Sequence, residues 1–338
     1  MNRFYFYSIH DIIRIRTNVE IPVPDYFKVK DEYEPDIEII QEDLNFDVPK
    51  KKKKKRKDYS VWKEDSALLI DYETPVLSTK LMIEDLQTKP KIRFTRTYLK
   101  HFKKHVFTLI NLILQLKLIQ KGYTLVHSSC VSFEDYCALI PALGSTGKTF
   151  TVLSLLDGKK FKFMSDDLTI LSREGEAFSY PGKIGTGPYV LKNESIPFLS
   201  VNPKISSKLA KFSIISIIFG KFPWLYKSKN LEMPKELITD KAKVKYLFLI
   251  TSGEENKATK IDKEEAISKV LIEHIDTHNL FGNYALNYYS FLCNFDLCTQ
   301  LEEMRNILRR GLKGVECYEL RSNNLYKYPE MIKEVLRR

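Results

Sequence analysis

The residues Ala142-Leu143-Gly144-Ser145-Thr146-Gly147-Lys148-Thr149 form a glycine-containing loop between two apolar segments. Before the loop, Cys137 to Pro141 is a short apolar run that predicts a buried strand. After it, Thr149 to Leu156 has apolar residues at a helical spacing, and Asp157-Gly158 supplies a stop signal. The order of strand, glycine-containing loop and helix is the context that a phosphate-binding P-loop requires.

Each part of this loop has a physical role in holding phosphate. Gly144 and Gly147 allow backbone angles at which several N–H groups point at one phosphate, and the helix N-terminus adds partial positive charge. We expect Lys148 to reach the outer phosphates of a nucleotide and the Thr149 hydroxyl to bind Mg²⁺. The residues predicted to bind the nucleotide are Gly144, Ser145, Thr146, Gly147, Lys148, Thr149 and Phe150.

One residue departs from the strict P-loop pattern. Ala142 stands where a glycine is usual. Alanine is the smallest substitute for glycine, so the departure weakens the pattern without removing it. The alternative interpretation is a loop in which glycine, lysine and threonine meet by chance.

Two adjacent carboxylates, Asp166 and Asp167, follow the predicted helix. Phe161 to Met164 predicts a strand, and Leu168 to Leu171 continues in extended character, so the acid pair interrupts a buried strand. Two like charges are costly there without a cation or a shared proton, and Mg²⁺ near Thr149 would supply the cation. We expect one carboxylate to hold the metal and the other to take the proton from an attacking hydroxyl. A solvated Ser-Asp-Asp turn is the alternative.

His127-Ser-Ser-Cys130-Val131, the loop and Ser165-Asp166-Asp167 together resemble the HPr kinase/phosphorylase family and its phosphoenolpyruvate carboxykinase relatives. In that family a histidine precedes the loop by about this spacing, and an Asp-Asp pair follows one helix later. The resemblance covers residues 120 to 338, where Val244 to Thr251 and Cys317 to Leu320 are similar to later strands of the family. It implies an α/β P-loop kinase core of the HPr kinase/phosphoenolpyruvate carboxykinase type, with a mixed sheet flanked by helices.

The resemblance also implies roles for single residues. Lys148 would bind phosphate, Thr149 would bind the metal, and Asp166 and Asp167 would serve as base and metal ligand. His127 would lie near the transferred phosphate, where a neutral imidazole could hydrogen-bond an aspartate or a metal-bound water; a structural histidine at a strand end is the alternative. Because HPr kinases assemble as hexamers, the resemblance permits a homo-oligomer.

The composition sets limits on the class of protein. The 338 residues are 43% hydrophobic and 29% charged, which is typical of a soluble globular protein with one large or two ordinary domains. No apolar run of roughly 18 residues predicts a membrane span, and the N-terminus lacks the layout of a signal peptide. The five cysteines contain no Cys-x-x-Cys pattern and favour reduced thiols over a zinc site. We therefore expect a cytoplasmic protein.

Lys50 to Lys57 is a run of eight consecutive basic residues. Because like charges repel and cannot be buried, the run predicts a flexible loop. We place it in an N-terminal β-rich domain, residues 1–95, with a catalytic domain at 96–338. The run could bind nucleic acid, bind an anionic membrane surface, act as a nuclear import tag, or be a solvated loop. Without it the net charge falls from +11 to +3, so the rest of the chain is not strongly basic.

These features favour a Mg-ATP-dependent kinase that transfers the γ-phosphate to a hydroxyl acceptor, either a protein serine or a small molecule. An RNA-directed kinase that uses the basic run is one alternative. A non-catalytic protein, in which ATP gates a partner or RNA surface near Lys50–Lys57, is another. The sequence does not choose among the acceptors.

Overall fold

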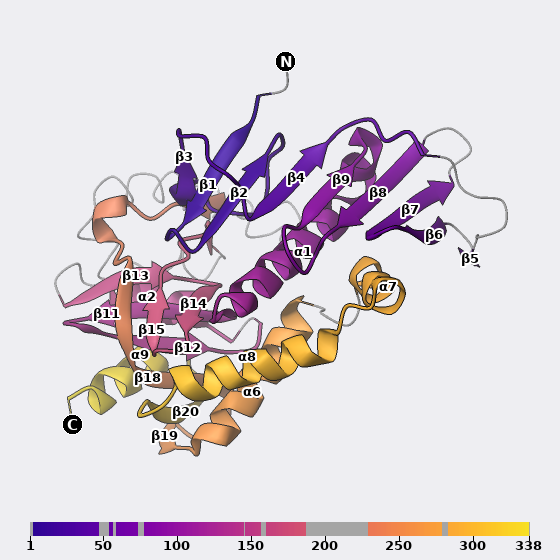
Figure 1. Cartoon of the computed structure of the whole chain (residues 1–338). Helices are drawn as coiled ribbons and strands as arrows, with labels where there is room; N and C mark the ends of the chain where they lie inside the picture. The colour runs from indigo at the N-terminus through magenta and orange to yellow at the C-terminus, as the bar shows by residue number, and fades with distance from the viewer. Residues whose placement is uncertain are drawn as a thin grey trace, which may run out of the picture. The chain divides into compact units, whose positions relative to one another are not determined.

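The computed structural model describes residues 3–46, 54–56, 59–73, 78–144, 146–156, 160–186, 229–278 and 283–337. The chain divides into two compact units, Met1–Gly122 with His278–Met304, and Tyr123–Thr277 with Arg305–Arg338. The described residues form two large mixed sheets and six α-helices (Figure 1), which confirms the expected α/β class. Among these residues, none of the helices combines the length and the apolar character needed to cross a membrane.

The first unit is built on a nine-stranded sheet in the order β3-β1-β2-β4-β9-β8-β7-β6-β5. Its strands are β1 (Tyr5–Ile9), β2 (Ile13–Thr17), β3 (Lys28–Val29), β4 (Ile37–Gln41), β5 (Lys54–Arg56), β6 (Tyr59–Glu64), β7 (Ala67–Glu73), β8 (Ser78–Glu84) and β9 (Lys91–Phe94). In β2, Ile13 and Ile15 are buried while Arg14 between them is exposed, so alternation in the sequence selects one buried face. The helix α1 (Arg96–Gln120) contacts β8, and α7 (Tyr284–Cys293) contacts β6 and β7.

The first unit differs from the expected domain of residues 1–95 in two places. It includes α1, because this helix covers β8. It also includes residues 278–304, which return from the far end of the sequence. Tyr289 of α7 ties them in place, since its hydroxyl accepts a hydrogen bond from the Leu86 N–H (3.3 Å) and donates one to the Ser66 carbonyl (3.2 Å). The expected second domain, residues 96–338, is interrupted accordingly.

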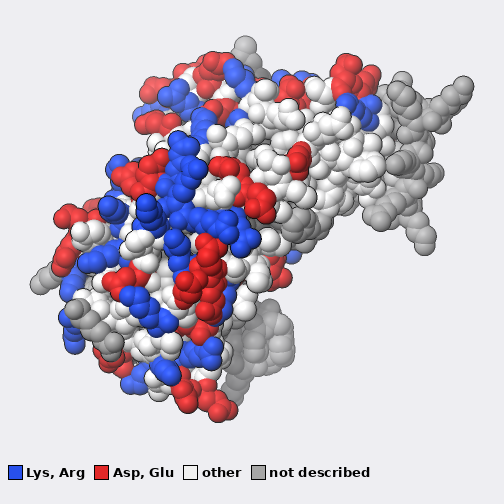
Figure 2. Space-filling view, turned by 60° about the horizontal axis from the view of Figure 1, so that its bottom comes forward, with Lys and Arg blue, Asp and Glu red and all other residues white. Residues whose placement is uncertain are grey.

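Part of the basic run Lys50–Lys57 belongs to this sheet. Lys54–Arg56 forms β5, which pairs antiparallel with β6. The expectation of a flexible loop is therefore wrong for these residues, because their main chain is paired. The other residues of the run lie outside the described residues, and binding of nucleic acid or an anionic surface through it stays a prediction. On the face drawn in Figure 2, Lys and Arg side chains are intermixed with Asp and Glu.

His105 of α1 makes the stability of the first unit sensitive to pH. Its ring stacks on Tyr284 of α7 with centroids 4.3 Å apart, and its Nδ1 lies 2.9 Å from the Tyr98 hydroxyl. Burial lowers the pKa of His105 from 6.5 to about 4. Between these two values the folded chain binds fewer protons than the unfolded chain. Stability present above pH 6.5 is therefore lost as the pH falls toward 4.

We expect His105→Gln to remove this part of the pH dependence. The free energy of unfolding of the wild-type chain should drop by about 2 kcal/mol more than that of the variant as the pH falls through this range. Thermal or urea unfolding of both proteins at several pH values measures the difference. His101→Gln, at an exposed position of the same helix, is the matched control and should follow the wild type. Parallel pH profiles for wild type and His105→Gln would contradict the prediction.

The second unit is built on a sheet in the order β10-β14-β15-β18-β12-β11-β13, and β20 pairs with β18 and β19. These strands are β10 (Tyr123–Val126), β11 (Ser128–Phe133), β12 (Tyr136–Pro141), β13 (Phe161–Ser165), β14 (Thr169–Ser172), β15 (Glu176–Phe178), β18 (Lys241–Ser252), β19 (Lys257–Lys260) and β20 (Glu316–Ser322). A separate two-stranded sheet pairs β16 (Ile184–Thr186) with β17 (Lys229–Leu231). The helices are α2 (Lys148–Leu155), α6 (Lys263–His278), α9 (Lys327–Val335) and, from Arg305 onward, α8 (Leu297–Gly311).

The elements predicted around the glycine loop are confirmed. The strand before it is β12, the helix after it is α2, and the later strands predicted at 244–251 and 317–320 are β18 and β20. β12 and β20 both run parallel to β18, so the carboxyl ends of the three strands lie at one edge of the sheet. Helix α2 contacts β11 and α9, and the core beneath it contains Val152, Phe163 and Phe248.

Candidate active site

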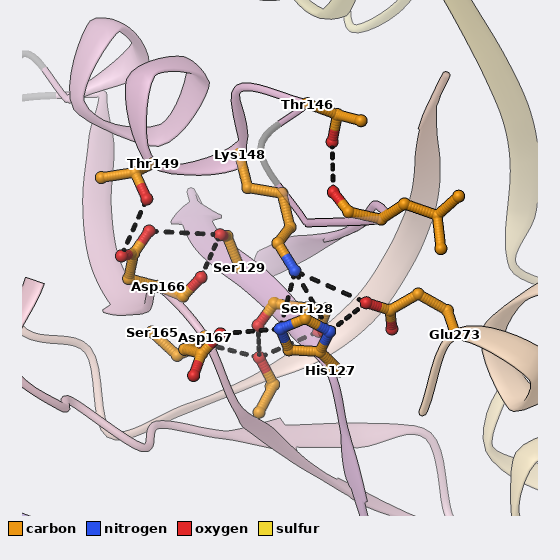
Figure 3. A network of polar contacts seen from close by, with 12 residues as sticks. His127, Ser128, Ser129, Thr146, Lys148, Thr149, Ser165, Asp166, Asp167 and Glu273 are labelled. Atoms are coloured by element: carbon orange, nitrogen blue, oxygen red, sulfur yellow. Dashed lines mark hydrogen bonds and ion pairs between the residues drawn. The ribbon is translucent and has the colours of Figure 1, made fainter. Parts of the chain in front are cut away.

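His127 and the acid pair meet where two neighbouring strands are interrupted. Only His127 separates β10 from β11, and only residues 166–168 separate β13 from β14. β10 pairs antiparallel with β14, and β11 pairs antiparallel with β13. The two interruptions therefore lie at the same level of the sheet, which places His127 beside Asp166 and Asp167 (Figure 3).

The glycine loop begins at the same level, because β12 pairs with β11 along its whole length. Within the loop, the Thr146 hydroxyl donates a hydrogen bond to the Leu143 carbonyl (2.6 Å). Gly147 is the cap residue, and Lys148 is the first residue of α2. The N-terminus of α2 and its Lys148 side chain thus lie next to the interrupted strands, as Figure 3 shows. The partial positive charge of a helix N-terminus favours an anion at this place.

Gly147 satisfies two constraints that other residues do not. Its φ angle is +102°, in the left-handed region. A Cβ atom built on it would lie 2.6 Å from Cδ2 of Leu325. Gly144, in contrast, has open space where its Cβ would be. Of the two loop glycines, Gly147 is the one that the backbone requires.

We expect Gly147→Ala to lower the free energy of unfolding by about 1–2 kcal/mol, because alanine is strained at this φ. The Leu325 side chain can move, so the backbone angle carries most of the cost. Gly144→Ala is the matched control and should change stability by less than about 0.5 kcal/mol. Urea unfolding of both variants measures the difference. Equal effects at the two positions would show that the left-handed angle is not required.

Asp166 is joined to both flanking segments. Its Oδ2 accepts a hydrogen bond from the Thr149 hydroxyl of α2 (3.0 Å), and its carbonyl accepts one from the Ser129 hydroxyl of β11. The residue keeps some exposure, but protein atoms surround its carboxyl group. This burial raises the pKa of Asp166 to about 6, although the hydrogen bond from Thr149 works in the opposite direction. An ionised Asp166 is therefore costly until a cation approaches it.

His127 connects Asp167 to a buried carboxylate of helix α6. Its Nε2 lies 2.7 Å from Asp167 Oδ1, and its Nδ1 hydrogen-bonds Glu273. The Lys148 ammonium lies 2.9 Å from Nε2 of the imidazole and 3.7 Å from Glu273 Oε1. His127 and Glu273 are buried, whereas the Asp167 side chain is 74% exposed. The cluster thus runs from a buried carboxylate to an exposed one.

Burial and charge act in opposite directions on this cluster. Burial lowers the pKa of His127, but the hydrogen bonds with Asp167 and Glu273 outweigh it and raise the pKa above its ordinary value. Burial lowers the pKa of Lys148, and the neighbouring carboxylates only partly offset this. The ammonium is therefore poised to gain from an anionic ligand, since added negative charge would favour its protonated form.

Sequence reasoning missed Glu273, which lies 146 positions after His127 in the chain. A signal was present in helix α6, where Glu273 continues the buried face formed by Ile267 and Val270. Glutamate on the apolar face of a helix is rarely buried without a partner. Ser129 was also missed, because a serine in an extended run carries no pattern of its own.

The structure brings together five of the residues singled out in the sequence, His127, Lys148, Thr149, Asp166 and Asp167, while their roles stay predictions. Gly144, Thr146 and Gly147 lie in the loop before α2, whereas Ser145 lies outside the described residues. The Phe150 side chain packs in the core, so only its main-chain N–H could face a phosphate.

The residues present suit a hard divalent cation that takes only some of its oxygen ligands from the protein. Thr149 and Asp166 offer oxygen atoms, and burial raises the pKa of the enclosed Asp166 carboxyl although the Lys148 ammonium acts in the opposite direction. Within the described ranges, no group of three His, Cys, Asp or Glu side chains could bind a metal by itself. Mg²⁺ fits this arrangement, because it keeps several waters and takes further oxygen ligands from substrate phosphates.

Comparison with known proteins does not establish a family. No family model matches the chain, and no curated protein matches it. Among solved structures, the chain is similar to the HPr(Ser) kinase/phosphatase from Coxiella burnetii, with 9% identity and a TM-score of 0.28 over 63% of this chain and 94% of that one. A likeness at this TM-score carries no conclusion about activity.

Proposed function

We propose that this protein is a Mg-ATP-dependent kinase that transfers the γ-phosphate to a hydroxyl group. One observation carries the proposal: Thr149, at the start of the helix that follows the glycine loop, lies 3.0 Å from the enclosed carboxylate of Asp166. A hydroxyl and a carboxylate beside a helix N-terminus and a lysine are the parts that P-loop enzymes use for nucleotide phosphates and their metal.

The loop and Lys148 would bind the polyphosphate. The main-chain N–H groups at the start of α2 and the Lys148 ammonium would hold the β- and γ-phosphates. Lys148 lies against His127 and Glu273. A bound polyphosphate would therefore replace part of the attraction that these two side chains exert on the Lys148 ammonium. Fixing the phosphates in this way lowers the entropy cost of in-line transfer.

Thr149 and Asp166 would hold Mg²⁺, and Ser129 would keep Asp166 in place through its bond to the main chain. When bound, the metal neutralises charge on the β- and γ-phosphates. Among the described residues of this cluster, three carboxylates lie with one ammonium and one imidazole, an excess of acidic groups that favours a bound cation. This excess of negative charge supports a divalent cation at Asp166, and it leaves the Asp167 carboxylate available to act as the base.

Asp167 would act as the base. Its carboxylate is exposed to an incoming acceptor, and the imidazole of His127 holds one of its oxygens at 2.7 Å. In the reaction, the acceptor oxygen forms a bond to the γ-phosphorus while the bond to the β-phosphate oxygen breaks, and Asp167 takes the hydroxyl proton. Glu273, buried behind His127, would fix which ring nitrogen faces Asp167.

Incubation with γ-labelled ATP and separate pools of protein, RNA and small metabolites tests the proposal. Label should enter one pool with the wild-type chain and not with Asp167→Asn. The pool that takes the label identifies the acceptor class, and label in RNA would favour the RNA-directed alternative. Binding of Mg-ATP with no transfer to any pool would favour the ATP-gated binding protein. Absence of Mg-ATP binding would overturn both functions.

A further inference from the structure

A second segment leaves the sheet at the edge where the glycine loop begins. β12 and β20 both run parallel to β18, so the turn after β20 and the loop after β12 emerge at the same edge. That turn, residues 323–326, connects β20 to α9. Its Leu325 lies against the loop, since Cδ2 occupies the space that a Cβ on Gly147 would need. Ligands of open α/β sheets bind outside the carboxyl ends of strands, which is where this turn lies.

Hydrogen bonds fix the turn in place. The Tyr328 hydroxyl shares its one proton between the carbonyls of Ser322 (2.7 Å) and Thr251 (2.9 Å), which ties α9 to β18 and β20. Ser322 Oγ accepts from the Asn324 N–H (2.9 Å), and Asn324 Oδ1 accepts from the Tyr326 N–H (3.0 Å). The position of Tyr326 is thus set by the bonds on both sides of it.

Tyr326 presents an aromatic ring beside the first turn of α2. Its ring meets the buried ring of Phe150 edge to face, with centroids 5.2 Å apart and an interplanar angle of 76°. Nevertheless the residue is 52% exposed. Of the four large hydrophobic residues exposed among the described residues, Leu143, Ile272, Phe291 and Tyr326, two belong to the segments that leave this edge, Leu143 of the glycine loop and Tyr326. Exposed apolar groups next to a phosphate-binding helix indicate a ligand with an apolar part.

We propose that Tyr326 is the stacking platform for the nucleobase of the bound nucleotide, a role that rests on the proposed binding of ATP at this loop. The polyphosphate lies at the N-terminus of α2, and Phe150, in the first turn of that helix, touches Tyr326. The base of the same molecule extends from the phosphates along this edge and stacks on the exposed tyrosine ring. Because every base has a π-face, such a platform selects nucleotides over inorganic polyphosphate without selecting one base.

Titration calorimetry with two ligands, Mg-ATP and Mg-tripolyphosphate, tests this role. Tripolyphosphate has the phosphates but no base. Tyr326→Leu keeps an apolar contact with Phe150 and removes the aromatic face, and it should weaken Mg-ATP binding about 10-fold. Its affinity for Mg-tripolyphosphate should stay within about 2-fold of the wild type. Tyr326→Phe keeps the ring and should bind both ligands like the wild type. Phe291→Leu, at an exposed aromatic position of α7, is the control.

The two ligands separate the possible failures. If Tyr326→Leu binds Mg-ATP as tightly as the wild type, the platform is wrong while phosphate binding stands. If the variant loses both ligands equally, Tyr326 only supports α2 through Phe150, and the platform is again wrong. If the wild-type chain binds neither ligand, the proposed function fails and the platform fails with it.

Discussion

Lys148→Ala is expected to abolish the thermal stabilisation of the protein by Mg-ATP. At a nucleotide concentration about 100 times the dissociation constant, binding stabilises a protein by about 2.7 kcal/mol. Removing the ammonium takes charge-assisted hydrogen bonds from the β- and γ-phosphates, and each of these contributes about 1.5–3 kcal/mol. The affinity should fall about 100-fold or more, so the stabilisation at the same concentration should drop below about 0.5 kcal/mol.

The measurement compares the shift in thermal unfolding that Mg-ATP causes in each protein. The unfolding temperatures themselves are not compared, because Lys148 also forms an ion pair with the buried Glu273. The variant without nucleotide will itself unfold more easily, and the quantity of interest is the shift that Mg-ATP adds. Lys162→Ala is the matched control, since Lys162 is an exposed lysine on β13 of the same unit. A full Mg-ATP shift in Lys148→Ala would show that the glycine loop does not hold the nucleotide through this side chain.

The local elements of the site could be predicted from the sequence because neighbouring residues determine them. Apolar runs in the sequence predicted β12 and β13. A helical spacing after a glycine predicted α2, although the first residue of this helix is Lys148 and not Thr149. The adjacency of Asp166 and Thr149 also followed, since strand, loop, helix and strand are consecutive. These features depend on short-range pattern and backbone geometry.

The remaining features depend on register and on contacts distant in sequence. His127 contacts Asp167 because β10 pairs with β14 and β11 pairs with β13, so that the gaps in the two chain segments lie side by side. The spacing of residues along the sequence does not reveal this register. Glu273 belongs to helix α6. The periodicity of the sequence indicates that this helix has an apolar face, but it does not indicate which strands the face covers. The return of residues 278–304 to the first unit has the same cause, because no local pattern states the sheet on which α7 packs.

The adjacent aspartates should fail in different ways when each is changed to asparagine. Asp167→Asn should lower the turnover of phosphate transfer by about 10²–10⁴-fold, because the hydroxyl proton loses its acceptor. Its affinity for Mg-ATP should stay near the wild-type value, since Asp167 is exposed and the Thr149 hydroxyl donates its hydrogen bond to Asp166. Calorimetry and transfer of labelled γ-phosphate measure the two quantities. Asp135→Asn, in the exposed turn between β11 and β12, is the control for a change of charge alone.

Asp166→Asn should stop transfer and also stabilise the protein without ligand. Burial raises the pKa of Asp166 from 3.8 to about 6, so between these values the folded chain binds more protons than the unfolded chain. Stability therefore falls as the pH rises through this window, and above it the ionised carboxylate costs about 2–3 kcal/mol. Asparagine carries no charge and still accepts a hydrogen bond from Thr149. Urea unfolding at pH values above the window should show a gain of that order for Asp166→Asn and none for Asp167→Asn.

Magnesium separates the two roles further. In the wild type, Mg²⁺ should strengthen ATP binding and also offset the cost of ionised Asp166. In Asp166→Asn the magnesium dependence of ATP binding should shrink, because one of the two protein oxygen ligands has lost its charge. In Asp167→Asn that dependence should match the wild type. Wild-type transfer rates in both variants would exclude the mechanism, since neither carboxylate would then serve as base or metal ligand. Reversed phenotypes would instead exchange the two roles, with Asp167 on the metal and Asp166 as the base.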